Sequence, residues 1–134
     1  MIHGIGIDIV RNERIKKAVE AWGRRFLIRI FTESEIAYCS RRKDPYPSLA
    51  ARFAAKEAFV KAMGGRASVR WTDIEITNDR LGKPTVHAHN ELGRLLAGHS
   101  LQQVHVSMSH EKEYSIACVV IERTMERSET GAAE

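Results

Sequence analysis

A long apolar helix in the middle of the chain constrains the fold more than any other feature. Residues 48–65 read SLAARFAAKEAFVKAMGG. Alanines cover much of one side of such a helix, and the opposite side carries Leu49, Phe53, Val60 and Met63. A helix that is apolar almost all round is buried rather than lying on the surface. We therefore expect a central buried helix that is capped by Ser48 and ends at Gly64 and Gly65.

Charged residues interrupt this apolar helix, and the most informative are Lys56, Glu57 and Lys61. Buried charges are unfavourable unless they pair with each other or hold a ligand. Glu57 and Lys61 stand four residues apart, so their side chains project to the same side. This spacing leaves two interpretations open. One is a structural ion pair, and the other is a site where the carboxylate binds magnesium and the cation binds a phosphate.

A second carboxylate lies in the N-terminal segment 2–10, whose alternating pattern predicts a β-strand. Asp8 near its end is either the N-cap of the following helix or a metal ligand. Together with Glu57 it makes a two-carboxylate magnesium site possible, completed by water and substrate phosphates. Gly4 and Gly6 lack the third glycine of a dinucleotide-binding pattern, so we expect them to allow close backbone approach within a strand pair.

The remaining segments predict an α+β fold with one domain over residues 1–123 and a disordered tail over 124–134. Helices are expected over 11–22, from a capping box at Thr32 and Glu35 to Ser40, and from Asn90 to Ala97. The prolines of segment 41–47 predict a loop. Strands are expected over 71–77, 83–87, 104–108 and 114–121.

Charge is distributed unevenly along the chain. Residues 1–66 carry 14 Lys or Arg against 7 Asp or Glu, whereas residues 67–134 carry 7 against 10. Within segment 11–29 there are seven cations and two acids, interleaved with Trp22 and Phe26. Such a surface favours an anionic partner: nucleic acid, an acidic protein or a phosphorylated ligand. Because the chain shows no ribonucleoprotein signature and no GXXG loop, we favour a protein-docking face and expect no nucleic-acid partner.

The sequence also predicts that the protein is cytoplasmic. No apolar stretch approaches the ~20 residues of a membrane span, so no membrane partner is expected. Residues 1–8 lack a basic leader and a cleavage site, and Cys39 and Cys118 lack metal-ligand spacing. His87 and His89 have no third zinc ligand nearby, whereas His110 follows a strand at a turn, where it can face a ligand.

Taken together, these segments resemble the holo-acyl-carrier-protein synthases, the small bacterial type of 4′-phosphopantetheinyl transferase. The two most specific blocks stand about 50 residues apart: the strand with Asp8, and the helix with Lys-Glu-x-x-x-Lys at residues 56–61. The other matching segments are, in order, 31–35, 73–75, 78–79, 82–84 and 106–110. The resemblance implies the fold of that family, an antiparallel sheet packed around a long buried helix.

The resemblance also implies a reaction. Phosphopantetheine would move from coenzyme A to a serine of apo acyl carrier protein in fatty acid biosynthesis, with release of adenosine 3′,5′-bisphosphate. A magnesium ion, which manganese could replace, would be bound by Asp8 and Glu57 at the coenzyme's pyrophosphate. Catalysis of this kind rests on positioning and on neutralising charge at the phosphate oxygens. Glu57 and a magnesium-held water are both open as acceptors of the serine proton.

Further roles follow from the resemblance, position by position. Phosphates would be contacted by Lys61 and His110. The coenzyme site would be lined by Arg52, Gly64, Gly65, Lys83 and Pro84. The acidic helix of the carrier protein would meet Arg14, Arg24, Arg25 and Phe26. The family assembles as a trimer with active sites between subunits, so a homotrimer is expected.

The competing class is a non-enzymatic basic module that binds RNA or an acidic protein. Such a module would have to use Asp8, Glu57 and Lys61 for structure alone, and it gives no reason for placing charges in an apolar helix. The enzyme interpretation accounts for them.

Overall fold

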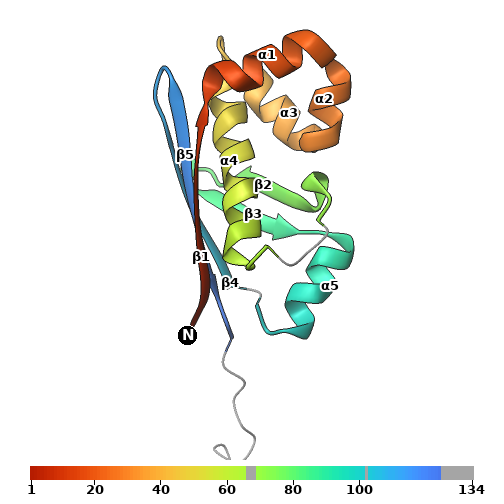
Figure 1. Cartoon of the computed structure of the whole chain (residues 1–134), viewed down its shortest axis with the longest axis vertical. Helices are drawn as coiled ribbons and strands as arrows, with labels where there is room; N and C mark the ends of the chain where they lie inside the picture. Colours follow the sequence, from red (N-terminus) through yellow and green to blue (C-terminus); the bar gives the residue numbers. More distant parts are fainter. Residues whose placement is uncertain (66–68, 102, 125–134) are drawn as a thin grey trace, which may run out of the picture.

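The computed structural model describes residues 1–65, 69–101 and 103–124, with five helices, one 3₁₀ turn and five strands among them. In chain order these are β1 (Ile2–Arg11), α1 (Asn12–Trp22), α2 (Arg24–Ile30), α3 (Glu33–Ser40), α4 (Tyr46–Ala62), the 3₁₀ turn η1 (Trp71–Asp73), β2 (Ile74–Asn78), β3 (Pro84–Ala88), α5 (Asn90–Gly98), β4 (Gln103–His110) and β5 (Tyr114–Glu122) (Figure 1). The predicted α+β class is therefore confirmed. Of the tail expected over 124–134, residues 125–134 lie outside the described residues.

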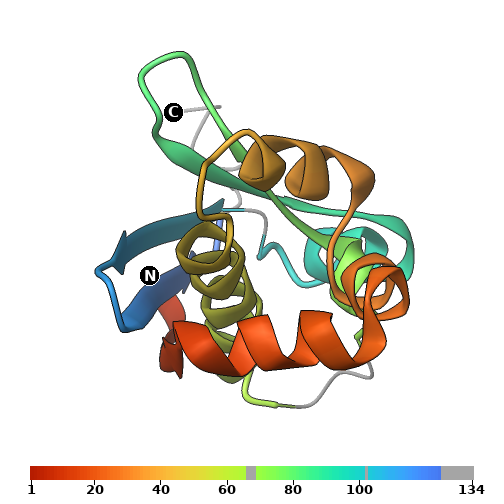
Figure 2. The same cartoon turned by 90° about the horizontal axis from the view of Figure 1, so that it is seen from above.

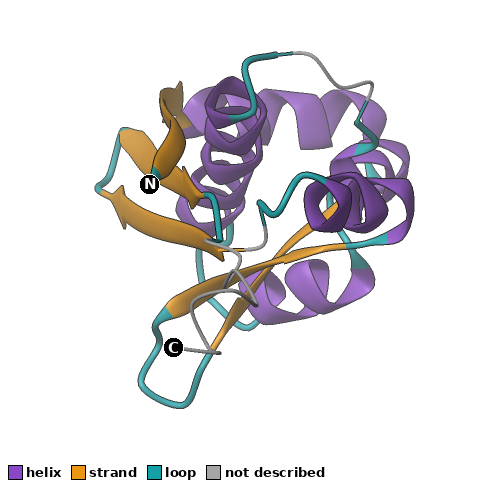
Figure 3. Cartoon of the chain, turned by 90° about the horizontal axis from the view of Figure 1, so that it is seen from below, coloured by secondary structure: helices purple, strands orange, loops and turns teal. Residues whose placement is uncertain are grey.

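Helix α4 lies between two antiparallel sheets. One sheet has three strands in the order β1-β5-β4, and the other is the β2–β3 hairpin. Seen along α4, the three-stranded sheet is on one side of the helix, while the hairpin and α3 are on the other (Figure 2). All helices gather on the same side of the three-stranded sheet, which leaves its outer face uncovered by the described residues (Figure 3).

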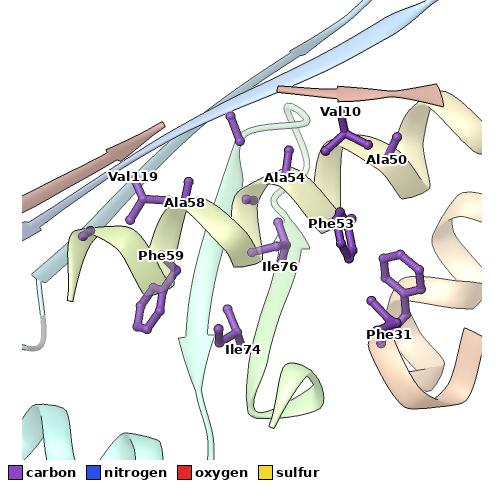
Figure 4. Close-up of a cluster of buried hydrophobic side chains, with 14 of the residues drawn as sticks. Val10, Phe31, Ala50, Phe53, Ala54, Ala58, Phe59, Ile74, Ile76 and Val119 are labelled. Atoms are coloured by element: carbon purple, nitrogen blue, oxygen red, sulfur yellow. The ribbon is translucent and has the colours of Figure 1, made fainter. Parts of the chain in front are cut away.

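The core follows from the two sides of α4. Small alanines, including Ala54 and Ala58, face the sheet, where Val119 of β5 is fully buried (Figure 4). The larger Phe59 points the other way, toward Ile74 of β2. Small side chains let the helix approach the sheet closely, and large ones fill the wider space under the hairpin. The expected central buried helix is thus confirmed.

The two glycines of β1 permit close packing, but not within the strand pair as expected. A Cβ atom on Gly4 would lie 1.8 Å from the carbonyl oxygen of Ala62, and one on Gly6 would lie 1.8 Å from that of Ala58. Both carbonyls belong to the end of α4. The glycines therefore let the backbone of a strand touch the backbone of a helix, a contact that any side chain would prevent.

Three expectations about helix starts meet different outcomes. The capping box of α3 is confirmed, since the Thr32 side chain accepts from the Glu35 N–H and the Glu35 side chain accepts from the Thr32 N–H. Ser48 is not a cap, because α4 begins at Tyr46, whose N–H donates to the Asp44 carboxylate at 3.1 Å. The loop predicted over 41–47 is therefore too long, because Pro47 lies in the first turn of α4. Backbone N–H groups in a first helical turn have no acceptor within the helix, so a proline is tolerated there.

Asn90 is also not a cap. It is the first residue of α5, with a φ of 55°, and His89 occupies the cap position. The Asn90 side chain instead donates to the Asp73 carboxylate at 2.9 Å, which ties α5 to the 3₁₀ turn.

Candidate active site

Asp8, Glu57 and Lys61 come together where β1 lies against α4. The Lys61 ammonium group lies 3.2 Å from Asp8 Oδ1 and donates to the carbonyl of Ile7 at 3.0 Å. Asp8 therefore pairs with a cation of α4. Among the described residues no side chain caps α1, so the capping interpretation of Asp8 is wrong.

The expectation that the charges of α4 are all buried is wrong for Lys61, whose side chain is 55% exposed, whereas that of Asp8 is 18% exposed. Lys61 pairs with Asp8, and no ion pair with Glu57 is found in the described part of the chain. The simple i,i+4 pair is therefore not what the structure contains. The three groups form a charged cluster that solvent can reach.

Glu57 has the electrostatic environment of a cation ligand. Burial raises the pKa of the Glu57 carboxyl group, and the neighbouring Asp8 charge raises it further, against smaller opposing effects of Lys61 and Arg14. Two carboxylates that repel each other favour a bound cation between them. The described residues contain no group of three or more His, Cys, Asp or Glu side chains that could hold a metal. A pair of carboxylates fits magnesium, which keeps several waters and binds substrate phosphates.

A second cluster surrounds Arg52, which is only 2% exposed. Its guanidinium group donates to the Asn78 side chain and to Ser48 Oγ, and it lies over the Tyr38 ring at 4.4 Å. Within the described residues its Nε atom has no hydrogen-bond partner. A buried donor without a partner requires an explanation, and a bound anion is one.

The cleft beside Arg52 has a volume of about 220 Å³. It is lined on the side of the hairpin and β4 by Gly82, Pro84, Met108 and His110. Lys83 stands between two of these lining residues in the hairpin turn. The structure thus brings together Arg52, Pro84 and His110, three of the residues expected at the coenzyme and its phosphates.

Gly64 lies elsewhere, at the end of α4. There Gly64 and Lys61 line a cleft of about 680 Å³ between β1 and α5. Gly64 and Gly65 have φ values of 85° and 70°, a conformation that glycine adopts without strain and that ends the helix. This part of the expected coenzyme site therefore belongs with Asp8 and Glu57 rather than with Arg52.

The two clusters lie at opposite edges of the three-stranded sheet. Asp8 is on edge strand β1 and His110 is on edge strand β4, with β5 between them. We call the group of Asp8, Glu57 and Lys61 the carboxylate half-site, and the group of Arg52, Pro84 and His110 the arginine half-site. Within one chain they face different directions around α4.

The basic surface expected over 11–29 is formed by α1 and α2. Arg14, Arg24 and Arg25 are exposed there, and Trp22 is also exposed. Phe26 is half-buried and packs edge-on against Phe31. The Arg14 guanidinium lies 5.6 Å from the centre of the Phe53 ring on α4. Since Phe53 precedes Glu57 by one turn of α4, the basic surface adjoins the carboxylate half-site.

Sequence reasoning missed the partner of Lys56. This lysine is fully buried and forms a 2.7 Å ion pair with Glu35, which is also fully buried. The available signal was Lys56 itself, because a lysine among alanines in a buried helix requires a counter-charge. Glu35 was assigned only to the capping box of α3.

Comparison with known proteins identifies the family. Residues 4–119 match the family model described as the 4′-phosphopantetheinyl transferase superfamily. The chain is 45% identical over 121 residues to the holo-[acyl-carrier-protein] synthase of Halothermothrix orenii, covering 90% of this chain and 97% of that protein. The chain belongs to the holo-[acyl-carrier-protein] synthase family. It is therefore a phosphopantetheinyl transferase that acts on acyl carrier protein, as the resemblance implied.

Solved structures of holo-[acyl-carrier-protein] synthases share the fold. The structure of the Neisseria meningitidis synthase matches with a TM-score of 0.83 and 40% identity, covering 91% of this chain and 99% of that one. The synthase of Helicobacter pylori, solved in complex with coenzyme A, matches with a TM-score of 0.77 and 32% identity, covering 88% of this chain and 99% of that one. The predicted phosphopantetheinyl transferase fold is confirmed.

Proposed function

We propose that residues 1–123 form a catalytic domain that transfers 4′-phosphopantetheine from coenzyme A to a serine of apo acyl carrier protein for fatty acid biosynthesis. Adenosine 3′,5′-bisphosphate would be the second product. The observation that carries the proposal is the solvent-accessible carboxylate half-site in a member of this family. Family membership and the coenzyme A bound by the Helicobacter pylori relative support the choice of substrates.

The carboxylate half-site would hold the divalent cation. Asp8 and Glu57 supply two carboxylates that repel each other, so magnesium, or manganese in its place, would be bound between them. When bound, the cation neutralises charge on the pyrophosphate. Lys61 adds a positive charge at the same place, and Glu57 is the chain's own candidate acceptor for the serine proton.

The arginine half-site would hold the nucleotide end of coenzyme A. Arg52 brings a buried guanidinium whose Nε–H has no partner among the described residues, and His110 and Lys83 bring further donors at the cleft. Guanidinium groups bind phosphate through several parallel hydrogen bonds. Pro84 contributes an apolar wall against which a base can lie.

A homotrimer would join the two half-sites. On β1, Ile5, Ile7 and Ile9 are all more than half exposed on the outer face of the three-stranded sheet. Ile116 of β5 extends this apolar face. Contiguous exposed apolar surface marks an interface. Packing this face between copies would set the carboxylate half-site of one chain beside the arginine half-site of the next.

The carrier protein would dock on the basic surface of α1 and α2. Arg14, Arg24 and Arg25 offer charge complementary to an acidic helix, and Phe26 adds apolar contact. Because this surface adjoins Glu57, a serine presented there would lie near the proposed cation site.

The compartment would be the cytoplasm. Cys39 and Cys118 are free thiols, as is usual for proteins in a reducing compartment. Among the described residues no helix is long and apolar enough to cross a membrane.

The test is intact-mass analysis of an apo acyl carrier protein after incubation with the enzyme, coenzyme A and magnesium. The proposal expects the carrier protein to gain the mass of one phosphopantetheine, with adenosine 3′,5′-bisphosphate appearing in equal amount. A carrier protein whose catalytic serine is replaced by alanine is the control. An unchanged carrier mass with a purified, folded enzyme would contradict the proposal.

A further inference from the structure

The Lys56–Glu35 ion pair is the most completely buried polar interaction among the described residues. Both side chains are 0% exposed, and Lys56 Nζ lies 2.7 Å from Glu35 Oε1. The ammonium group also donates to the carbonyls of Ile30 at 2.8 Å and Trp71 at 3.0 Å. An ammonium group has three hydrogens, so all three are used.

The Glu35 carboxylate makes two further contacts beyond Lys56. Oε1 accepts from the Thr32 N–H at 2.9 Å, and Oε2 accepts from the Ile76 N–H at 3.0 Å. Thr32 is the cap of α3, and Ile76 is in the middle of β2. One carboxylate thus joins α4, α3 and β2.

Strand β2 links the Lys56–Glu35 ion pair to the arginine half-site. Asn78, two residues after Ile76, accepts from Arg52 and donates to the carbonyl of Gly82 in the hairpin turn at 3.0 Å. Arg52 precedes Lys56 by one turn of α4. The helix and the hairpin are therefore held together at two points. One is the direct Arg52–Asn78 contact, and the other runs from Lys56 through Glu35 to Ile76.

Stability alone does not account for this pair. Removing two charges from water is so unfavourable that apolar residues of similar volume often stabilise a fold equally well or better. The centre of the Phe31 ring lies 5.5 Å from the Lys56 ammonium group, so part of its surroundings is apolar. What a buried pair adds is a defined arrangement, because each donor and acceptor must meet its partner.

We propose that Glu35 and Lys56 are positioning residues for coenzyme binding. They fix the β2–β3 hairpin relative to α4, so that the Arg52 guanidinium and the hairpin turn meet the nucleotide together. The inference rests on the proposed function, which places the nucleotide at the arginine half-site. Neither residue touches the coenzyme.

The deciding variant is the double substitution Glu35→Gln with Lys56→Met. It removes both charges, so neither is left unpaired, and it keeps the volume of both side chains. We expect a folded protein with a lower unfolding temperature than the wild type, because the carbonyls of Ile30 and Trp71 lose the donor that Lys56 supplies. We also expect the dissociation constant for coenzyme A, measured by calorimetry, to rise about tenfold, and kcat/KM for coenzyme A to fall about 10- to 100-fold. KM for the carrier protein should stay unchanged.

Val119→Ala is the matched control. Val119 is fully buried but packs on the sheet side of α4, away from the hairpin. The cavity should lower the unfolding temperature and leave the coenzyme A dissociation constant unchanged. Binding that falls with stability in this control as well would overturn the inference.

Should the double variant fail to fold, Glu35→Asp decides in the same assay. It keeps the counter-charge of Lys56 but shortens the reach to Ile76 by one methylene, so weaker coenzyme A binding is expected. If a folded variant binds coenzyme A as tightly as the wild type does, the inference is overturned and the proposed function is not. Wild-type protein that binds no coenzyme A overturns the proposed function with it.

Discussion

Lys61 Nζ lies 3.2 Å from Asp8 Oδ1, so a side chain near the end of α4 reaches across to β1. Because Lys61 is more than half exposed, this ion pair contributes about 1 kcal/mol or less to stability. The main effect of this contact is therefore the position of the Lys61 charge, and its effect on stability is small. It keeps a cation beside two carboxylates at the place where a pyrophosphate is proposed to bind.

The first prediction is dependence on a divalent cation. EDTA should abolish transfer, and magnesium or manganese should restore it, because Asp8 and Glu57 would otherwise repel the pyrophosphate. Asp8→Asn and Glu57→Gln should each lower turnover by orders of magnitude. Since the fold disfavours the ionised form of Glu57, Glu57→Gln should unfold at the wild-type temperature or above it. Full activity in EDTA would rule out the proposed site.

The second prediction concerns assembly. Light scattering should give a mass near three times 15.1 kDa. Ile7→Asp, which places a charge on the outer face of the sheet, should yield folded monomers without transferase activity, because the half-sites are then separated. An active monomer would contradict the shared-site arrangement.

The third prediction concerns docking by charge. Arg14→Glu combined with Arg24→Glu should raise KM for the carrier protein severalfold and leave KM for coenzyme A unchanged. Added salt should act in the same direction on the wild type, since the screening length falls to ~8 Å at physiological ionic strength. Arg94→Glu, exposed on α5 at the other end of the molecule, is the control. A selective loss of coenzyme A binding in the double variant would show that the basic surface is misassigned.

The fourth prediction is that Gly6→Ala prevents normal packing of β1. Its methyl group would overlap the carbonyl oxygen of Ala58, and neither backbone can move away without breaking the sheet or the helix. We expect destabilisation of about 3 kcal/mol or more in urea unfolding, at the upper end of overpacking effects. Gly98→Ala, where an added Cβ meets no atom within 4 Å, should leave stability unchanged or raise it. Equal effects of the two substitutions would contradict the close strand–helix contact.

The fifth prediction concerns Glu75 at low pH. Burial raises the pKa of its carboxyl group, but hydrogen bonds from Ser34, Thr32 and His89 outweigh this and lower it to about 2, from an ordinary 4.5. A depressed carboxyl pKa stabilises the fold above the ordinary value, and that contribution is lost as pH falls toward 2. The stability difference between wild type and Glu75→Gln should therefore shrink as pH falls from 4.5 to 2.

Local and periodic features were predictable from the sequence. The apolar pattern of α4 and the capping box at Thr32 and Glu35 each depend on residues within a few positions of one another. The local sequence could not predict which of the two lysines of α4 is buried. Lys56 and Lys61 differ in environment because of Glu35 and Asp8, which lie 21 and 53 residues away in the chain. Only the tertiary arrangement distinguishes them.

The same limit explains the glycines and the misplaced cap. Gly4 and Gly6 indicate close approach, but the sequence does not say whether the neighbour is a strand or α4. Ser48 has the chemistry of a cap, yet Pro47 can occupy a first helical turn, so α4 starts earlier. The charges at Asp8, Glu57 and Arg52 were identified as functional candidates, whereas their division between two sheet edges depends on the strand order.

That division has a genetic consequence. If each reaction centre takes its carboxylates from one subunit and its arginine from the neighbour, a chain lacking Asp8 and a chain lacking Arg52 are each inactive alone but can complement each other in a mixed trimer. Some active sites in that trimer would combine the intact Asp8 of one subunit with the intact Arg52 of its neighbour. Loss-of-function alleles that affect different half-sites would then complement each other, as mutations in two separate genes do.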